Sequence, residues 1–260
     1  MDAKRFLERR GLWPATVRTA LSCAVVLLIW QCLTTFVVTN GMLLATPVSV
    51  FHALMHEVAT GALWTNSVAT GIALFVAFPA SVIIGVLMGL LLASNRTAAL
   101  VFGPILTAIS SVPIIALAPL FVAWLGLGYA SKFVLIGMVA IFPVIVTTEG
   151  ALKAADKDLI EASCSFNATG WQVFTTVTFP YALSFIIGGI RVAWARALVG
   201  VVVAEFFGAF AGYGFAIVAA GQNFDTATLL AYVFMLGALG LLGSLLLEYL
   251  ERKLAPWRSA

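Results

Sequence analysis

Charged side chains are scarce in this sequence. They make up 10% of the 260 residues, whereas 62% of the residues are hydrophobic and the mean hydropathy is +1.09. A soluble domain carries roughly 25% charged residues. The composition therefore excludes a soluble globular protein. It predicts a polytopic membrane protein whose surplus of apolar side chains faces lipid.

Residues that commonly carry chemistry are also few. His52 and His56 lie four residues apart in a short amphipathic stretch, a spacing at which two histidines can share a metal ion. No third ligand lies in obvious register, so we expect no metal site and a helix near the lipid headgroups instead. Cys23, Cys32 and Cys164 form no cluster, and the first two are about 13 Å apart on one helix, too far for a disulfide. No catalytic constellation of an enzyme emerges.

The phosphate-binding pattern G-x-x-x-x-G-K-[ST] is absent as well. We therefore expect no cofactor in this chain and no ATPase activity of that kind. If ATP drives the protein, another polypeptide must bind it. The net charge of +3 could suggest a nucleic-acid partner. The positions of the basic residues argue against one, because they follow a membrane topology.

Six apolar runs approach or exceed the roughly 20 residues that a membrane span requires. The first follows a basic start that could belong to a signal peptide, but its length and the lack of a cleavage site favour a retained span. The sequence thus predicts an all-α fold with six transmembrane helices at 19–38, 66–93, 98–125, 133–148, 181–210 and 227–247. The predicted organisation is an N-terminal segment 1–18, a single transmembrane domain 19–250 and a tail 251–260.

Lysine and arginine gather on one side of these spans. Five basic residues precede the first span, and one lies in the turn between the second and third spans. Two lie in the loop 153–180 and three lie in the tail. The opposite side has Lys132 alone, while Arg191 and Arg196 lie within the fifth span. Because cytoplasmic loops carry the excess of basic residues, both termini and the loop 153–180 are predicted to be cytoplasmic.

Small residues recur every fourth position in the second span, and prolines interrupt the third. The small stripe lets another helix backbone approach closely and predicts a packing seam. Its members are Ala77, Ser81, Gly85, Gly89 and Ala93. Carbonyls freed by proline are tolerated where they line a watery cavity. The prolines of the third span are Pro104, Pro113 and Pro119, of which the last two are candidates for a translocation pathway or gate.

The fifth span carries three ionisable residues, Arg191, Arg196 and Glu205, which are candidates for the same pathway or gate. If a helix begins near Pro180 and Glu205 marks the outer edge, Arg196 lies roughly 17 Å deep in a core about 30 Å thick. Arg191 can reach the cytoplasmic face. Arg196 is predicted either to help an anion across or to be a structural arginine held by backbone carbonyls.

The loop 153–180, KAADKDLIEASCSFNATGWQVFTTVTFP, is the one long polar segment that is clearly structured. Ala155, Leu159, Ala162 and Phe166 recur at helical spacing and form one apolar face. This face is too short to span a membrane and too apolar to stay bare in water. It is therefore predicted to meet another protein.

The same loop resembles the EAA loop of ABC-importer permeases, which reads Glu-Ala-Ala, three residues, Gly, nine residues, Ile-x-Leu-Pro. Every spacing is kept, although four of the seven identities differ. The matching positions are Glu161, Ala162, Ser163, Asn167, Val177, Phe179 and Pro180. Asn167 takes the glycine place, and asparagine is the other common residue that tolerates a left-handed backbone at a helix end.

The resemblance widens to residues 66–257, through SVPIIALAPLFVAWLGLG, FPYALSFIIGGIR, VVVAEFF and ERKLAPW. These stretches resemble the sulfonate, nitrate and taurine branch of ABC importers. The resemblance implies a permease homodimer in the bacterial inner membrane, two cytoplasmic ATPase subunits that bind ATP and Mg²⁺, and an external or periplasmic binding protein. It also implies a coupling helix, with ATPase contacts at Leu159, Glu161, Ala162, Ser163, Phe166, Asn167, Gly170 and Pro180. The implied substrate is a small organic or inorganic anion such as a sulfonate, taurine or nitrate, with pyrimidine-type vitamin precursors as the second choice.

The alternative is a secondary transporter or channel that works without an ATPase. It would need ionisable residues in the spans for coupling or selectivity, and few are present. Gly212, Tyr213 and Gly214 resemble the GYG of a potassium filter, but Ala-Phe-Ala precedes them rather than Thr-Val. We interpret them as part of a flexible outer connection, 211–226.

Overall fold

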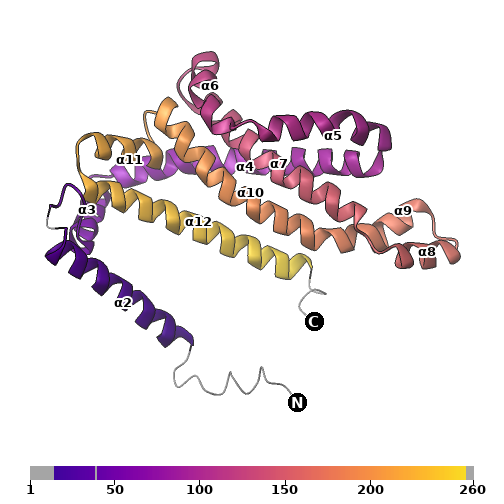
Figure 1. Cartoon of the computed structure of the whole chain (residues 1–260), viewed down its shortest axis with the longest axis horizontal. Helices are drawn as coiled ribbons and strands as arrows, with labels where there is room; N and C mark the ends of the chain where they lie inside the picture. Colours follow the sequence, from indigo (N-terminus) through magenta and orange to yellow (C-terminus); the bar gives the residue numbers. More distant parts are fainter. Residues whose placement is uncertain (1–14, 39, 256–260) are drawn as a thin grey trace.

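The computed structural model describes residues 15–38 and 40–255, and every regular element within these ranges is helical (Figure 1). The basic segment before residue 15 lies outside the described residues. In chain order the elements are α2 (Ala15–Phe36), α3 (Pro47–Ala59), α4 (Ala62–Ser94), α5 (Arg96–Ser111), η1 (Ile114–Leu117), α6 (Ala118–Leu125), α7 (Tyr129–Lys153), α8 (Lys157–Ser165), α9 (Gly170–Val173), η2 (Phe174–Thr178), α10 (Phe179–Gly208), α11 (Tyr213–Gln222) and α12 (Thr226–Leu254).

Five of the described helical segments are long and apolar enough to cross a membrane. They are α2, α4, α7, α12 and the continuous run Gly170–Gly208, which joins α9, η2 and α10. A sixth candidate is α5 with the η1–α6 pair, which are bent by 74° from one another. The predicted all-α polytopic fold is confirmed at this level, with five or six spans.

The third span is not the continuous helix that its length suggested. The chain leaves α5 at Val112, whose backbone is extended, and Pro113 precedes the 3-10 turn η1. Proline has no N–H and disfavours a helical conformation in the residue before it, so a break at this place has a direct cause. Pro104 lies inside α5 without ending it, and Pro119 lies in the first turn of α6, where proline is tolerated.

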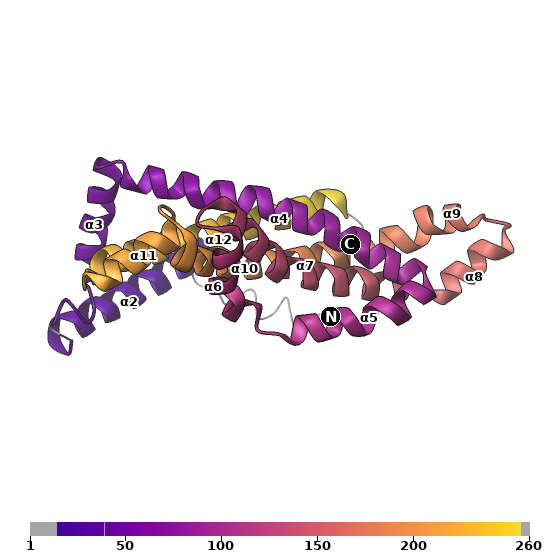
Figure 2. The ribbon, with the colours of Figure 1, turned by 90° about the horizontal axis from the view of Figure 1, so that it is seen from above.

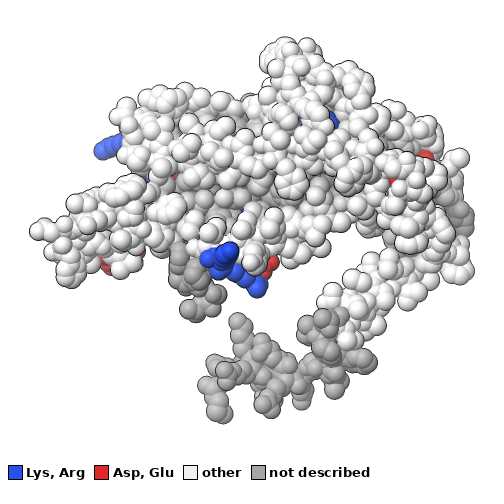
Figure 3. Space-filling view, turned by 180° about the vertical axis from the view of Figure 1, so that it is seen from behind, with Lys and Arg blue, Asp and Glu red and all other residues white. Residues whose placement is uncertain are grey.

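The centre of the molecule is α7, which packs against α4 and α10 (Figure 2). The main core cluster contains Leu74 from α4, Ile136 and Val144 from α7, and Trp194 and Val201 from α10. By contrast, α2 is almost entirely exposed, and only 6% of its apolar segment Thr19–Phe36 is buried within the chain. Figure 3 shows one face of the molecule with acidic and basic side chains at only a few places. Such a surface suits contact with lipid.

The small residues of α4 lie along α7. Ala77, Ser81, Gly85 and Gly89 are buried and Ala93 is half-buried. A Cβ atom added to Gly85 would lie 2.8 Å from Val144 Cβ, and one added to Gly89 would lie 2.6 Å from Thr148 Cβ. The backbones of α4 and α7 therefore approach to a distance that leaves no room for a larger side chain at these two glycines.

Replacing Gly89 by leucine is expected to force α4 away from α7. Overpacking of a well-filled site costs about 1–3 kcal/mol, so the yield of monodisperse protein and its melting temperature in detergent should both fall. Gly71→Leu is a matched control on the same helix, because nothing lies within 4 Å of a Cβ added at Gly71. Equal behaviour of the two variants in size-exclusion chromatography would contradict a seam.

Segments joining the spans gather at the two ends of the long axis. The α8–α9 pair lies at one end, whereas α3 and α11 lie at the other (Figures 1 and 2). The last helix, α12, continues to Leu254 and so includes the first residues of the predicted tail. The π-helical turn η2 connects α9 to α10 without interrupting the helix, so the segment after α8 runs directly into the fifth span.

Candidate functional site

The polar loop forms a short helix that ends in the predicted backbone conformation. Asp156 begins α8 by accepting a hydrogen bond from the Asp158 N–H at 2.9 Å. At the other end Asn167 has φ 59°, the left-handed conformation expected of it, and its N–H donates to the Cys164 carbonyl at 2.9 Å. The amide side chain of Asn tolerates this region better than a branched side chain does.

The apolar face of the loop is shorter than predicted but is left uncovered. Ala155 precedes α8 and is buried against the bundle, so it does not share the face of the helix that follows. Leu159 is 54% exposed and Phe166 is 87% exposed. Trp171 on the next helix is exposed too. Exposed large apolar side chains beside polar residues are the kind of surface that another protein can bind.

A reciprocal cap restarts the helix after the turn. The Thr169 hydroxyl accepts from the Gln172 N–H, while the Gln172 side chain accepts from the Thr169 N–H at 2.7 Å. This capping box fixes the direction in which α9 leaves the loop. Gly170 is the first residue of α9, and Pro180 lies in the first turn of α10, the place expected for it.

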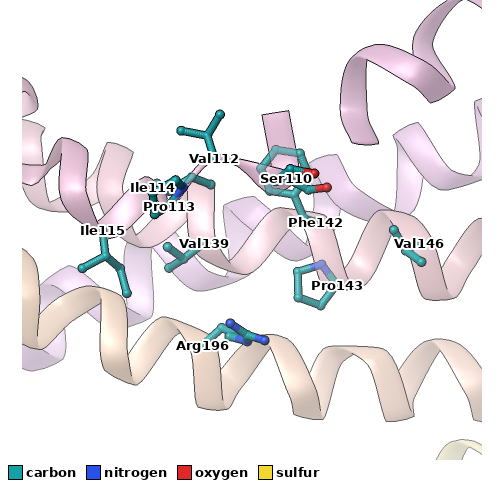
Figure 4. Close-up of a pocket in the computed structure, with 11 residues that line it drawn as sticks. Ser110, Val112, Pro113, Ile114, Ile115, Val139, Phe142, Pro143, Val146 and Arg196 are labelled. Carbon is teal, nitrogen blue, oxygen red and sulfur yellow. The ribbon is translucent and has the colours of Figure 1, made fainter. Parts of the chain in front are cut away.

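Arg196 and Pro113 come together at one cavity. The cavity has a volume of about 510 Å³ and lies where the break after α5 faces the middle of α7 and α10 (Figure 4). Its polar lining comes from Ser110, Ser111 and Arg196, and the other lining residues are apolar. Within the described residues no carboxylate lies at ion-pair distance from Arg196.

The remaining pathway candidates lie elsewhere. Arg191 forms an ion pair with Glu251 of α12 at 2.7 Å. Pro119 belongs to the first turn of α6. Glu205 is 1% exposed, and its carboxylate forms an ion pair with Lys132 inside the bundle. Of the five candidates, the structure brings only Pro113 and Arg196 to one place.

Glu205 forms a buried ion pair that the sequence did not reveal. Lys132 Nζ lies 3.1 Å from Glu205 Oε1 and donates a second hydrogen bond to the Ala211 carbonyl at 3.0 Å. The Thr70 hydroxyl and the Gly214 N–H also donate to the carboxylate, at 3.0 and 2.9 Å. The prediction that Lys132 lies in the turn before the fourth span is therefore wrong, because it lies in the first turn of α7 and is 3% exposed. The sequence signal that could have indicated this ion pair was the presence of one lysine and one glutamate, Lys132 and Glu205, in otherwise apolar segments.

The Gly-rich connection is ordered, which corrects the prediction of a flexible segment over 211–226. Gly212 N–H donates to Asn66 Oδ1 at 2.9 Å, and α11 begins at Tyr213. Gly212 has φ 132°, and a Cβ atom there would lie 2.1 Å from Glu205 Oε1. Only glycine allows the backbone to close over the carboxylate in this way.

The paired histidines lie on α3. Glu57, next to His56, accepts a hydrogen bond from the Tyr232 hydroxyl of α12. In the part of the chain that the structure describes, no three side chains of histidine, cysteine, aspartate or glutamate lie together as a metal site would require.

Comparisons with known proteins identify relatives along most of the chain. The model of a family described as "Binding-protein-dependent transport system inner membrane component" matches residues 81–256. The putative aliphatic sulfonates transport permease protein SsuC of Bacillus subtilis is 30% identical over 91% of this chain and 86% of its own length. The riboflavin transport system permease protein RibX of Chloroflexus aurantiacus is 30% identical over 97% and 94%, respectively. The taurine transport system permease protein TauC of Escherichia coli is 29% identical over 94% and 92%.

A solved structure shares the fold. The MetNI methionine ABC transporter in an inward-facing conformation matches 74% of this chain and 97% of its own chain, with a TM-score of 0.62 at 20% identity. This likeness supports the helical architecture, and the family match covers more than half of the sequence. The chain therefore belongs to the binding-protein-dependent transport system inner membrane components and is an ABC transporter permease.

Proposed function

We propose that the chain is the membrane subunit of an ATP-driven importer, and that α8 is its coupling helix. The observation that carries the proposal is the exposed apolar pair Leu159 and Phe166 beside Glu161 at one end of the molecule. An ATPase subunit in the cytoplasm would cover this surface. ATP and Mg²⁺ would bind to that partner, and two ATPase subunits would serve a homodimer of the permease.

The proposed orientation puts both termini and α8 in the cytoplasm of a bacterial cell, with the chain in the inner membrane. The basic residues of the loop 153–180 and of the end of α12 support it, because cytoplasmic segments carry the excess of lysine and arginine. An external or periplasmic binding protein would then dock at the end that carries α3 and α11. No nucleic-acid partner is proposed, and lipid surrounds the spans.

The proposed substrate is a small anion, either organic or inorganic. The relatives carry names for sulfonates, taurine, riboflavin and formylaminopyrimidine, so their names do not select one substrate for this chain. Arg196 supports an anion, because it is a cation on a span, at a cavity, with no carboxylate partner in the described structure. A pyrimidine-type vitamin precursor is the second candidate.

The test is uptake into proteoliposomes that hold the permease with its ATPase, supplied with the binding protein. Uptake should require ATP on the side of the membrane where the ATPase subunits lie. It should stop when the ATPase is omitted. Uptake that persists without the ATPase, driven by an ion gradient alone, would favour the secondary transporter instead.

Replacing Arg196 by glutamine is expected to lower the uptake of an anionic substrate tenfold or more. A hydrogen bond to a charged group contributes about 1.5–3 kcal/mol, and glutamine removes the charge while keeping a polar side chain. Arg196→Lys is the matched control, because it keeps the charge and should retain most of the uptake. Unchanged uptake by a folded Arg196→Gln complex would assign Arg196 a structural role.

A further inference from the structure

A second cavity adjoins the one at Arg196. It has a volume of about 250 Å³, lies between α5 and α7, and reaches Thr107 and Glu149. The two cavities share Ser110, Phe142 and Val146 in their linings. They are therefore adjacent, and we name the two together the α5–α7 cleft. On α7 it extends from Val139 to Glu149, a length of about 15 Å at 1.5 Å per residue.

Three hydroxyl groups line this cleft from one face of α5. Thr107, Ser110 and Ser111 are separated by three and four residues, the spacing of neighbours on a helix surface. Each hydroxyl donates to a backbone carbonyl within one turn, at 3.0, 2.9 and 2.8 Å. Their lone pairs remain available, and a hydroxyl can rotate to donate to a ligand.

No residue of α5 is fully buried in this chain. A row of hydroxyls on an otherwise apolar span suits a water-filled cleft or a packed helix rather than lipid. The hydrogen bonds of these hydroxyls to their own helix backbone leave their acceptor lone pairs free for water or a ligand.

The charges at the two ends of the cleft are unequal. Arg196 has no carboxylate at ion-pair distance within the described part of the chain. Glu149 lies 2.6 Å from Lys153, one turn further along α7, so its charge is compensated. The uncompensated charge that faces the cleft is therefore positive. Walls with one sign of charge concentrate ions of the opposite sign.

We propose that the α5–α7 cleft is a hydrated anion route, in which Arg196, Ser110 and Ser111 bind the oxyanion head of a small solute. Thr107 continues the route to the Glu149–Lys153 pair at the end nearer α8. A guanidinium with neighbouring hydroxyls is suited to the oxygens of a sulfonate or carboxylate, because charge-assisted hydrogen bonds are the strong ones. The apolar remainder of the lining accommodates the body of an organic anion. The inference rests on the proposed function for the direction of transport. The assignment of Arg196, Ser110 and Ser111 rests on the lining of the cleft alone.

The experiment measures which charge the cleft admits and needs no knowledge of the substrate. Cys23, Cys32 and Cys164 are exposed and are first replaced by serine in the full-length chain. Ser110→Cys is then introduced, and its reaction in inside-out membrane vesicles is followed with two thiol reagents. One is the anionic 2-sulfonatoethyl methanethiosulfonate, and the other is the cationic 2-trimethylammonioethyl methanethiosulfonate.

The anionic reagent is expected to react roughly tenfold faster than the cationic one, relative to their rates with a free thiol, since focusing of this kind changes local concentrations by tenfold or more. Adding Arg196→Gln should bring the two rates to near equality, and adding Arg196→Lys should keep the preference. Ile109→Cys is the control on the same helix, because it lines neither cavity and should show no preference.

Two results would overturn the proposal. Failure of both reagents to modify Ser110→Cys would show that the cleft is dry, and a preference that survives Arg196→Gln would show that another charge sets it. Both measurements are made without ATP or substrate. A failure of the proposed import function, seen in the uptake assay, is therefore distinguishable from a failure of the anion route.

Discussion

The Glu205→Ala variant is expected to lose about 3–5 kcal/mol of stability, because removal of one partner leaves a buried charge without compensation. The charge left behind is that of Lys132, whose side chain is enclosed by α7, α10 and the loop before α11. The variant also removes the acceptor for the Thr70 hydroxyl and the Gly214 N–H. Unfolding in mixed micelles, followed by tryptophan fluorescence, measures the change.

A double variant separates the loss of the pair from the loss of either residue. Lys132→Met with Glu205→Leu removes both charges together, and the measured loss should be smaller than for Glu205→Ala alone. The exposed pair of Glu248 and Arg252 on α12 provides the control. Glu248→Ala should cost no more than about 0.5 kcal/mol, as is usual for a surface pair spaced by four residues. A double variant as unstable as Glu205→Ala would mean that the hydrogen bonds, and not the charges, dominate.

The Glu161→Ala variant is expected to separate ATP hydrolysis from transport. Glu161 is exposed on α8 and forms no ion pair within the described structure, so its removal should leave the permease folded. The proposed contact is with a donor on the ATPase, where a charge-assisted hydrogen bond would be lost. The expected result is normal expression, continued hydrolysis by the ATPase and a large loss of uptake.

The turn that follows α8 gives a matched pair of variants. Asn167→Gly should retain uptake, because glycine adopts the observed φ of 59° without strain. Asn167→Val should not, because a branched side chain disfavours the left-handed region by about 1–2 kcal/mol, and the helix would end differently. Co-purification of the ATPase and uptake are the two readouts. Full uptake by both Glu161→Ala and Asn167→Val would contradict the coupling role.

The sequence was informative wherever a feature is local. Hydropathy predicted the order of the long helices and five of the six spans as single helices, because a lipid-facing helix must be apolar along its length, whereas the third span is a bent pair. Asn167 and Pro180 were predicted correctly in backbone terms, since both depend on the conformation of a single residue. The apolar face of the loop was predicted in part, and only Ala155 was assigned to the wrong element.

The features that the sequence did not predict are contacts between distant parts of the chain. Lys132 and Glu205 are 73 positions apart, and Asn66 reaches Gly212 over 146 positions. Nothing in a single sequence pairs such residues, so Lys132 was counted in a loop and the glycines were interpreted as flexible. The cavity at Arg196 has the same origin, since it depends on how α5 turns away after Val112.

The π-helical turn between the loop and α10 has a geometric consequence for Arg196. A π turn contains more residues than an α turn, and such turns occur often at functional sites. If Phe174–Thr178 returned to regular α geometry with one residue fewer per turn, the helix beyond it would rotate by about 100°, the angle that one residue subtends in an α-helix. Arg196 lies on that part of α10, so the additional residue of the π turn sets the direction in which its guanidinium faces the cleft.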